Sequence, residues 1–200
     1  MSDPTIKDPL RYQSPIALNL DEDVFPIKQC INIRGKNKGA TYVPDNHIFE
    51  LEDKIILRIN NKKYRLVEYH FHTPAEHVLN GKEYPSEIHY VFYEIKRGGS
   101  NHVKKFDVCN GENTDVDILV IGRVIKNTHE RINLSKLSVH LPSSYFEYDG
   151  SLTGEGDGSV PVRWIVGADH IRIPLDEIIQ VSKSSREIQP LDDRIILYEC

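Results

Sequence analysis

The histidines of this chain are concentrated in one short window. Four of the nine lie in the run VEYHFHTPAEHVLNGKEYPSEIHYVFYEI, residues Val67 to Ile95. Imidazole nitrogens bind zinc, and three of them without a fourth protein ligand leave an open position for water, as in catalytic zinc sites. The window is therefore either a metal centre or a hairpin that carries ordinary polar residues.

The first run of the window, YRLVEYHFH, has the composition of a β-strand. Successive side chains of a strand alternate between its two faces. One face is therefore expected to carry Leu66, Glu68, His70 and His72. On that face the two histidines of the HxH motif would point at the same place.

The second run, SEIHYVFY, repeats this alternation. It places Glu87, His89 and Val91 on one face. The intervening LNGKEYP is rich in turn residues, so the two runs can lie antiparallel and adjacent, and a third imidazole can join the first two. Glu68 and Glu87 each precede a histidine by two residues, which suits a carboxylate that accepts the imidazole N–H.

Spacing alone is a weak indication of a metal site, because short motifs of this kind arise by chance. Ordinary strand histidines remain the alternative at this stage. His77 is a competing ligand, although its place in the turn region after Pro74 favours a surface or loop-anchoring role.

The elements that must position these residues are mostly strands. Short β-type runs between turn residues predict a mainly β (α+β) protein, and 200 residues predict one domain, 1–200. Helical spacing of apolar residues indicates helices over 127–141 and 174–185.

Composition excludes some classes of function. A net charge of -5 gives no basic surface for nucleic acid. No apolar run is long enough to span a membrane, and the N-terminal residues lack the apolar core of a signal peptide, so a cytoplasmic protein is expected. Cys30, Cys109 and Cys200 are interpreted as free thiols, with one disulfide left open.

The order of motifs along nearly the whole chain resembles that of the alpha-class carbonic anhydrases. The matching segments are QSPIAL, YRLVEYHFHTPAEH, YPSEIHYVFY, LVIG, YDGSLT, VRWIV and REIQPLDDR. The segment HFHTPAEH with its short following turn looks more like the bacterial members. The resemblance implies a large, mostly antiparallel twisted central sheet with a few short peripheral helices.

The resemblance also implies an activity, a cofactor and partners. The activity is reversible hydration of carbon dioxide to bicarbonate by attack of zinc-bound hydroxide, so Zn²⁺ is the expected cofactor. Carbon dioxide and bicarbonate are the expected partners, with a monomer or a homodimer as the assembly. In this family His70, His72 and His89 would bind the zinc.

Further residues receive roles by the same resemblance. Glu87 would accept a hydrogen bond from His89. Thr153 would be a gatekeeper that accepts a hydrogen bond from the zinc-bound hydroxide and donates one to Glu76. His47 would shuttle protons. A small apolar pocket for the gas would consist of Val91, Val120, Leu152 and Trp164, residues that ordinary core packing explains equally well.

Two departures from the family concern the site directly. Glu68 stands where glutamine is usual, and its negative charge should raise the pKa of metal-bound water. The loop TGEGDGS, with Glu155 and Asp157, replaces a proline-containing segment after Thr153. These departures leave an alternative function open: a zinc-binding but catalytically weak or inactive binding or adhesion module. Relatives of that kind characteristically lose zinc histidines, whereas this chain keeps all three.

Overall fold

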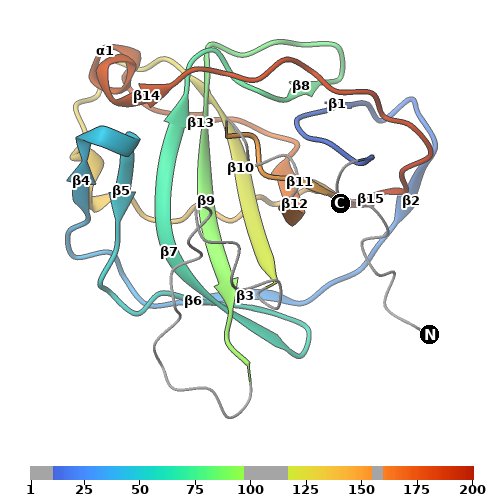
Figure 1. Ribbon diagram of the computed structural model, residues 1–200, viewed down its shortest axis with the longest axis horizontal. Helices are drawn as coiled ribbons and strands as arrows, with labels where there is room; N and C mark the ends of the chain where they lie inside the picture. Colours follow the sequence, from blue (N-terminus) through green and yellow to red (C-terminus); the bar gives the residue numbers. More distant parts are fainter. Residues whose placement is uncertain (1–10, 97–116, 155–159) are drawn as a thin grey trace.

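The computed structural model describes residues 11–96, 117–154 and 160–200. Most of its strands form one large twisted sheet of 13 strands, seen nearly face-on in Figure 1. Its main path runs in the order β2 (Val24–Pro26), β15 (Ile196–Glu199), β11 (Tyr145–Ser151), β12 (Pro161–Gly167), β10 (Ile118–Lys126), β9 (Ser86–Glu94), β7 (Lys62–His72), β5 (Ile48–Glu50) and β4 (Thr41–Val43). The strands β3 (Ile31–Arg34), β6 (Ile56–Ile59), β13 (Ile171–Arg172) and β14 (Ser182–Lys183) branch from this path. A separate parallel pair consists of β1 (Ala17–Leu18) and β8 (Val78–Leu79).

The predicted mainly β fold is confirmed. The central strands β7, β9 and β10 are antiparallel neighbours, as expected. The sheet is nevertheless mixed, because β10 runs parallel to β12 and β13, β7 runs parallel to β14, and β2 runs parallel to β15.

Helical structure is sparse in the described residues. The helix predicted over 174–185 is present in short form, as α1 (Leu175–Ile178) and a 3-10 turn, η4 (Ile179–Val181). A further 3-10 turn, η1 (Pro44–Asn46), lies between β4 and β5. No helix found in these ranges is long and apolar enough to cross a membrane.

The prediction of a helix over 127–141 is wrong. Only a 3-10 turn, η2 (Leu134–Lys136), forms there. The carbonyl groups that a helix would use internally accept hydrogen bonds from the sheet side instead: Tyr69 donates to Leu134, and Tyr90 donates to Ser138. The apolar residues of this segment pack singly against the core, so tertiary contacts outweigh the helical spacing.

The sheet is buried on both faces, and alternate residues of its central strands supply two separate cores. In β9, Ile88, Tyr90 and Phe92 join the first core, and Val91 joins the second. Glu87 and His89 share the face of Val91. The polar residues of the window therefore lie on the side of the second core.

Simple alternation fails at one place in β7. A β-bulge between Leu66 and Glu68 shifts the register. Leu66 lies in the first core together with Tyr69 and Phe71, and not on the face of the histidines as predicted. The extra residue changes which side chains share a face, so the two-residue repeat holds only on the His72 side of the bulge.

The cysteine prediction is confirmed in part. Cys30 and Cys200 are exposed free thiols. Cys109 lies outside the described residues.

Candidate metal site

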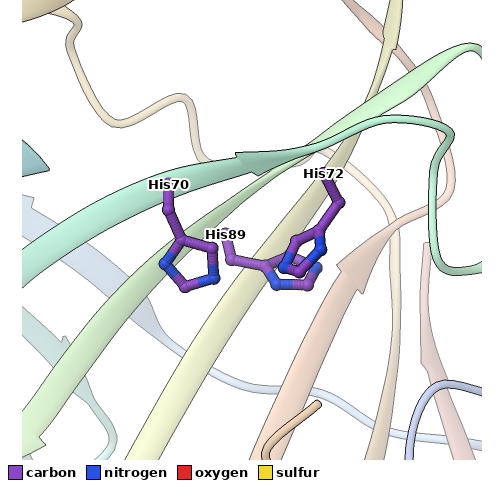
Figure 2. Close-up of side chains that lie close together, drawn as sticks. All are labelled: His70, His72 and His89. Atoms are coloured by element: carbon purple, nitrogen blue, oxygen red, sulfur yellow. The ribbon is translucent and has the colours of Figure 1, made fainter. Parts of the chain in front are cut away.

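Three buried histidines converge on the second-core face of the sheet. The register pairs His70 of β7 with His89 of β9, and His72 follows on the same face. Their ligand nitrogens all lie within 4.8 Å of one another. Figure 2 shows the three rings turned toward a common point, and the ring centroids of His72 and His89 are 4.7 Å apart.

Each of the first two rings has one nitrogen beside an acceptor. His72 Nδ1 lies 2.8 Å from the carbonyl oxygen of Ser184, next to β14. His70 Nδ1 lies 3.4 Å from Glu68 Oε1. The opposite nitrogens remain for an ion, and His72 Nε2 is buried without a hydrogen-bond partner in the described part of the chain.

The third ring has its two nitrogens in the opposite arrangement, with Nε2 rather than Nδ1 near an acceptor. His89 Nε2 lies 3.1 Å from Glu87 Oε1, which leaves Nδ1 for the common point. Three imidazoles, each with its outer nitrogen near an acceptor oxygen, match the donor set that zinc prefers. The residues present therefore fit a zinc ion.

The charge state of the rings also suits a metal. Burial, with the nearby charge of Lys183, holds the pKa of His70 well below its usual value. Burial and His89 lower the pKa of His72 to about 3. Both rings are neutral near pH 7, the form in which imidazole binds a metal.

Glu87 is fully buried, and its carboxylate contacts more groups than the single histidine that was predicted. Its Oε2 accepts the backbone N–H groups of Glu76 and His77 at 3.0 and 2.9 Å. Its Oε1 lies 2.8 Å from His77 Nδ1, in addition to the contact with His89. Burial raises the pKa of Glu87, but His77, His89 and their hydrogen bonds outweigh it and hold the pKa well below its usual range. The carboxylate is therefore charged and holds two rings.

Of the two roles predicted for His77, the surface role is wrong and the loop-anchoring role agrees with its contacts. Its side chain is fully buried, and Nε2 lies 2.7 Å from the hydroxyl of Tyr148. Tyr148 in turn donates to Ser14 at 3.2 Å. Sequence reasoning missed Tyr148 and Ser14 because His77, which they join, lies in a loop, where no periodicity predicts its partners. Only long-range contacts reveal that they link Glu87 to the N-terminal segment.

Glu76 reaches the same cluster from the loop after β7. Its carboxyl is buried, with Oε1 3.3 Å from His72 Nδ1, and it accepts the backbone N–H of Arg186 at 2.9 Å. Burial raises the pKa of Glu76, while His89 and a hydrogen bond from Thr153 act in the opposite direction. The structure thus brings Thr153 and Glu76 together. Glu155 and Asp157, in the loop that follows Thr153, lie outside the described residues.

The four apolar residues assigned to the gas pocket lie in one cluster beside the histidines. Val120 of β10 pairs with Val91 on one side and with Trp164 on the other. Leu152 packs against the same core. The ring centroid of Trp164 is 4.8 Å from that of His89, so the cluster adjoins the proposed metal site.

His47 occupies a turn at the edge of this region. It ends η1 with a positive φ of 51° and its Nδ1 lies 3.0 Å from the hydroxyl of Tyr42. The next residue, Ile48, pairs with His70 in the sheet. His47 is half-buried, next in sequence to a strand that borders the histidine cluster.

Comparison with known proteins gives a consistent result. No protein-family model matches the chain. A carbonic anhydrase of Pectobacterium carotovorum is 28% identical over 207 residues, covering 94% of this chain and 80% of that protein. A carbonic anhydrase of a Nostoc species is 28% identical over 202 residues, covering 94% and 75%.

Solved structures share the fold. The alpha-carbonic anhydrase of Thermovibrio ammonificans, solved with the inhibitor sulfanilamide, has a TM-score of 0.69 at 23% identity and covers 94% of this chain and 87% of its own. The alpha-carbonic anhydrase of Photobacterium profundum has a TM-score of 0.67 at 23% identity, with 94% and 89% covered. In sequence, this chain is therefore similar to carbonic anhydrases, and in fold it is similar to the alpha-carbonic anhydrases.

Proposed function

We propose that this chain is a zinc-dependent carbonic anhydrase that hydrates carbon dioxide reversibly to bicarbonate. One observation carries the proposal: the ligand nitrogens of three buried imidazoles lie within 4.8 Å of one another. The chemistry that zinc supplies with three histidines and an open position is the activation of a water molecule near neutral pH. His70, His72 and His89 would hold the ion.

The acceptors around the rings have a positioning role in this proposal. Glu68 and Glu87 would hold His70 and His89 through N–H groups, as the Ser184 carbonyl would hold His72. Such partners set the tautomer and direction of each ring, and their removal typically lowers metal affinity by about 10–100-fold.

Thr153 and Glu76 would select and orient the attacking oxygen. The hydroxyl of Thr153 would donate to the Glu76 carboxylate, which would leave its own oxygen as an acceptor. An attacking group that carries a hydrogen can donate a hydrogen bond to the Thr153 oxygen. A lone pair of the attacking oxygen is then aimed at the substrate. The cluster of Val91, Val120, Leu152 and Trp164 would receive carbon dioxide, which is small and apolar enough for such a site.

His47 would carry away the proton released in each turnover. A histidine exchanges protons near neutral pH, which suits transfer to buffer. If this role is correct, His47→Ala should slow turnover in dilute buffer, and added imidazole should restore it. A turnover that does not change in dilute buffer would exclude His47 as the shuttle.

A weaker function remains as the second candidate. Glu68 places a third carboxylate beside the histidines, in addition to Glu76 and Glu87. A zinc-binding chain with slow or no hydration is the outcome that this extra negative charge favours. We also propose that residues 1–200 form a single domain that acts as a monomer or a homodimer.

Metal analysis combined with stopped-flow hydration of carbon dioxide tests both candidates. The natural chain should copurify with zinc and hydrate carbon dioxide, and His89→Ala should lose both properties. His129→Ala, at an exposed position, is the matched control and should retain both. Absence of zinc from the natural chain would refute the proposal, and zinc without hydration would establish the second candidate.

A further inference from the structure

Basic side chains gather at the end of β10, in a part of the molecule that the proposed function does not use. The register pairs Lys126, the last residue of β10, with Arg172 of β13. Lys126 lies four residues beyond Gly122, the residue opposite His89, so about 13 Å of strand separates it from the proposed metal site. Two more residues complete the group that we call the basic cluster: Lys82, Lys126, His170 and Arg172.

The two paired residues of the basic cluster place like charges side by side. Register partners on neighbouring strands carry their side chains on the same face, and like charges in that position are destabilising. Within residues 11–96, 117–154 and 160–200, the side chains of Lys126 and Arg172 form no ion pair and no hydrogen bond. No described carboxylate therefore neutralises this pair of charges.

Tyr84 holds the other two members of the basic cluster. The ammonium of Lys82 lies 5.3 Å from the centre of the Tyr84 ring. The ring of His170 is stacked on the same tyrosine, with 6.5 Å between the ring centroids and 29° between the ring planes. Tyr84 is itself partly buried against the second core, so its ring gives both side chains a fixed support.

The charges of the basic cluster act together on His170. Burial lowers the pKa of His170, and so do the positive charges of the other three members of the cluster. The carboxylate of Asp169 acts in the opposite direction, but it already forms an ion pair with the buried Arg123, at 2.9 Å. The cluster therefore has a surplus of positive charge, although the net charge of the chain is -5.

The types and spacing of these side chains favour one class of ligand. A planar guanidinium, as in Arg172, can donate two parallel N–H groups to a phosphate or sulfate, and an ammonium, as in Lys126, binds the same group as a point charge. Because neighbouring strands lie about 4.8 Å apart, both side chains can reach one such anion. Two positive charges attract a dianion more strongly than a monovalent ion of the same size.

We propose that the basic cluster is a binding site for doubly charged tetrahedral oxyanions of the phosphate class, in which Lys126 and Arg172 contact the anion and the other two members add positive charge. The site is independent of the metal centre and of the proposed function. Free phosphate and phosphate esters share this chemistry, so the test includes both.

NMR titration of the intact chain with three anions at constant ionic strength tests the proposal. The probes are inorganic phosphate, phenyl phosphate and nitrate, at about pH 8, where the phosphate groups are doubly charged. Both phosphates should shift the backbone amide signals of Lys126 and Arg172, and both should bind more tightly than nitrate. Tighter binding of phenyl phosphate than of phosphate would identify an ester site, and the reverse order a site for the free ion. Equal affinity for nitrate, or shifts confined to the surroundings of His70 and His89, would overturn the proposal.

Two variants assign the contacts. Lys126→Gln and Arg172→Gln should each weaken phosphate binding by about three- to tenfold. Lys28→Gln, which removes an exposed lysine elsewhere, is the matched control and should bind phosphate as the natural chain does. Urea unfolding gives a second readout, because phosphate that binds the folded chain should raise the unfolding midpoint less in the two site variants than in the control. An equal loss of affinity in all three variants would reflect net charge alone and would contradict the proposed site.

Discussion

Gly122 is the residue whose enlargement should disturb the proposed metal site most selectively. It lies in β10 directly opposite His89. A Cβ atom added there would lie 2.6 Å from Glu87 Oε1 and 3.7 Å from Val166 Cγ2. The second contact is ordinary, but the first is about 0.8 Å shorter than the 3.4 Å at which contacts become ordinary. The carboxylate of Glu87 must therefore move in Gly122→Ala.

Glu87 cannot move without loss. The oxygen that would be displaced lies 2.8 Å from His77 Nδ1 and 3.1 Å from His89 Nε2, inside a fully buried cluster. Overpacking of this kind costs about 1–3 kcal/mol of folding free energy. Loss of the partner that orients a metal-binding histidine lowers metal affinity by about 10–100-fold. Both effects are expected in Gly122→Ala.

Two measurements check this expectation. Urea unfolding of the metal-free protein gives the change in stability, and competition with a chelator gives the zinc affinity. Gly39→Ala is the matched control, because nothing lies within 4 Å of a Cβ atom added at Gly39. Zinc affinity in Gly122→Ala equal to that in Gly39→Ala would refute the link from Gly122 through Glu87 to His89.

Three further predictions concern charge and protons at the site. Glu68→Gln should move the midpoint of the pH–rate profile to lower pH, because a negative charge near the metal is removed; an unchanged midpoint would remove this argument. Thr153→Val should retain zinc but lose about a hundredfold in turnover, since the attacking oxygen is no longer oriented; full turnover by stopped flow would contradict the role of Thr153. Because the pKa of His72 is lowered to about 3, the unfolded chain binds a proton below about pH 6.5 that the folded chain does not. The free energy of unfolding of the metal-free protein should therefore fall as pH drops from 7 to 5, and urea unfolding should show a smaller fall in His72→Gln. An equal dependence of this free energy on pH in both proteins would exclude His72 as its source.

The sequence predicted the strands and the gathering of the three histidines because both depend on a local rule. Alternation along β7 and β9 puts His70 and His72 on one face of the first strand and His89 on the matching face of the second, and a turn-rich connection makes the two runs antiparallel neighbours. The same rule placed Glu68 and Glu87 beside their histidines.

Features that depend on distant contacts were beyond this rule. The bulge after Leu66 changed the face of that residue, and the segment 127–141 gave its carbonyl groups to Tyr69 and Tyr90 instead of forming a helix. Periodicity describes one segment at a time, so it does not include the partners that other segments offer.

The sequence alone therefore determined which residues could form a metal site and on which strands they lie. The tertiary structure decided how they are held. His77 is buried against Glu87, Ser184 faces His72 from a segment more than a hundred residues away, and Gly122 leaves room for the Glu87 carboxylate. Each of these contacts joins positions that only packing brings together, and packing depends on the shape of the whole core.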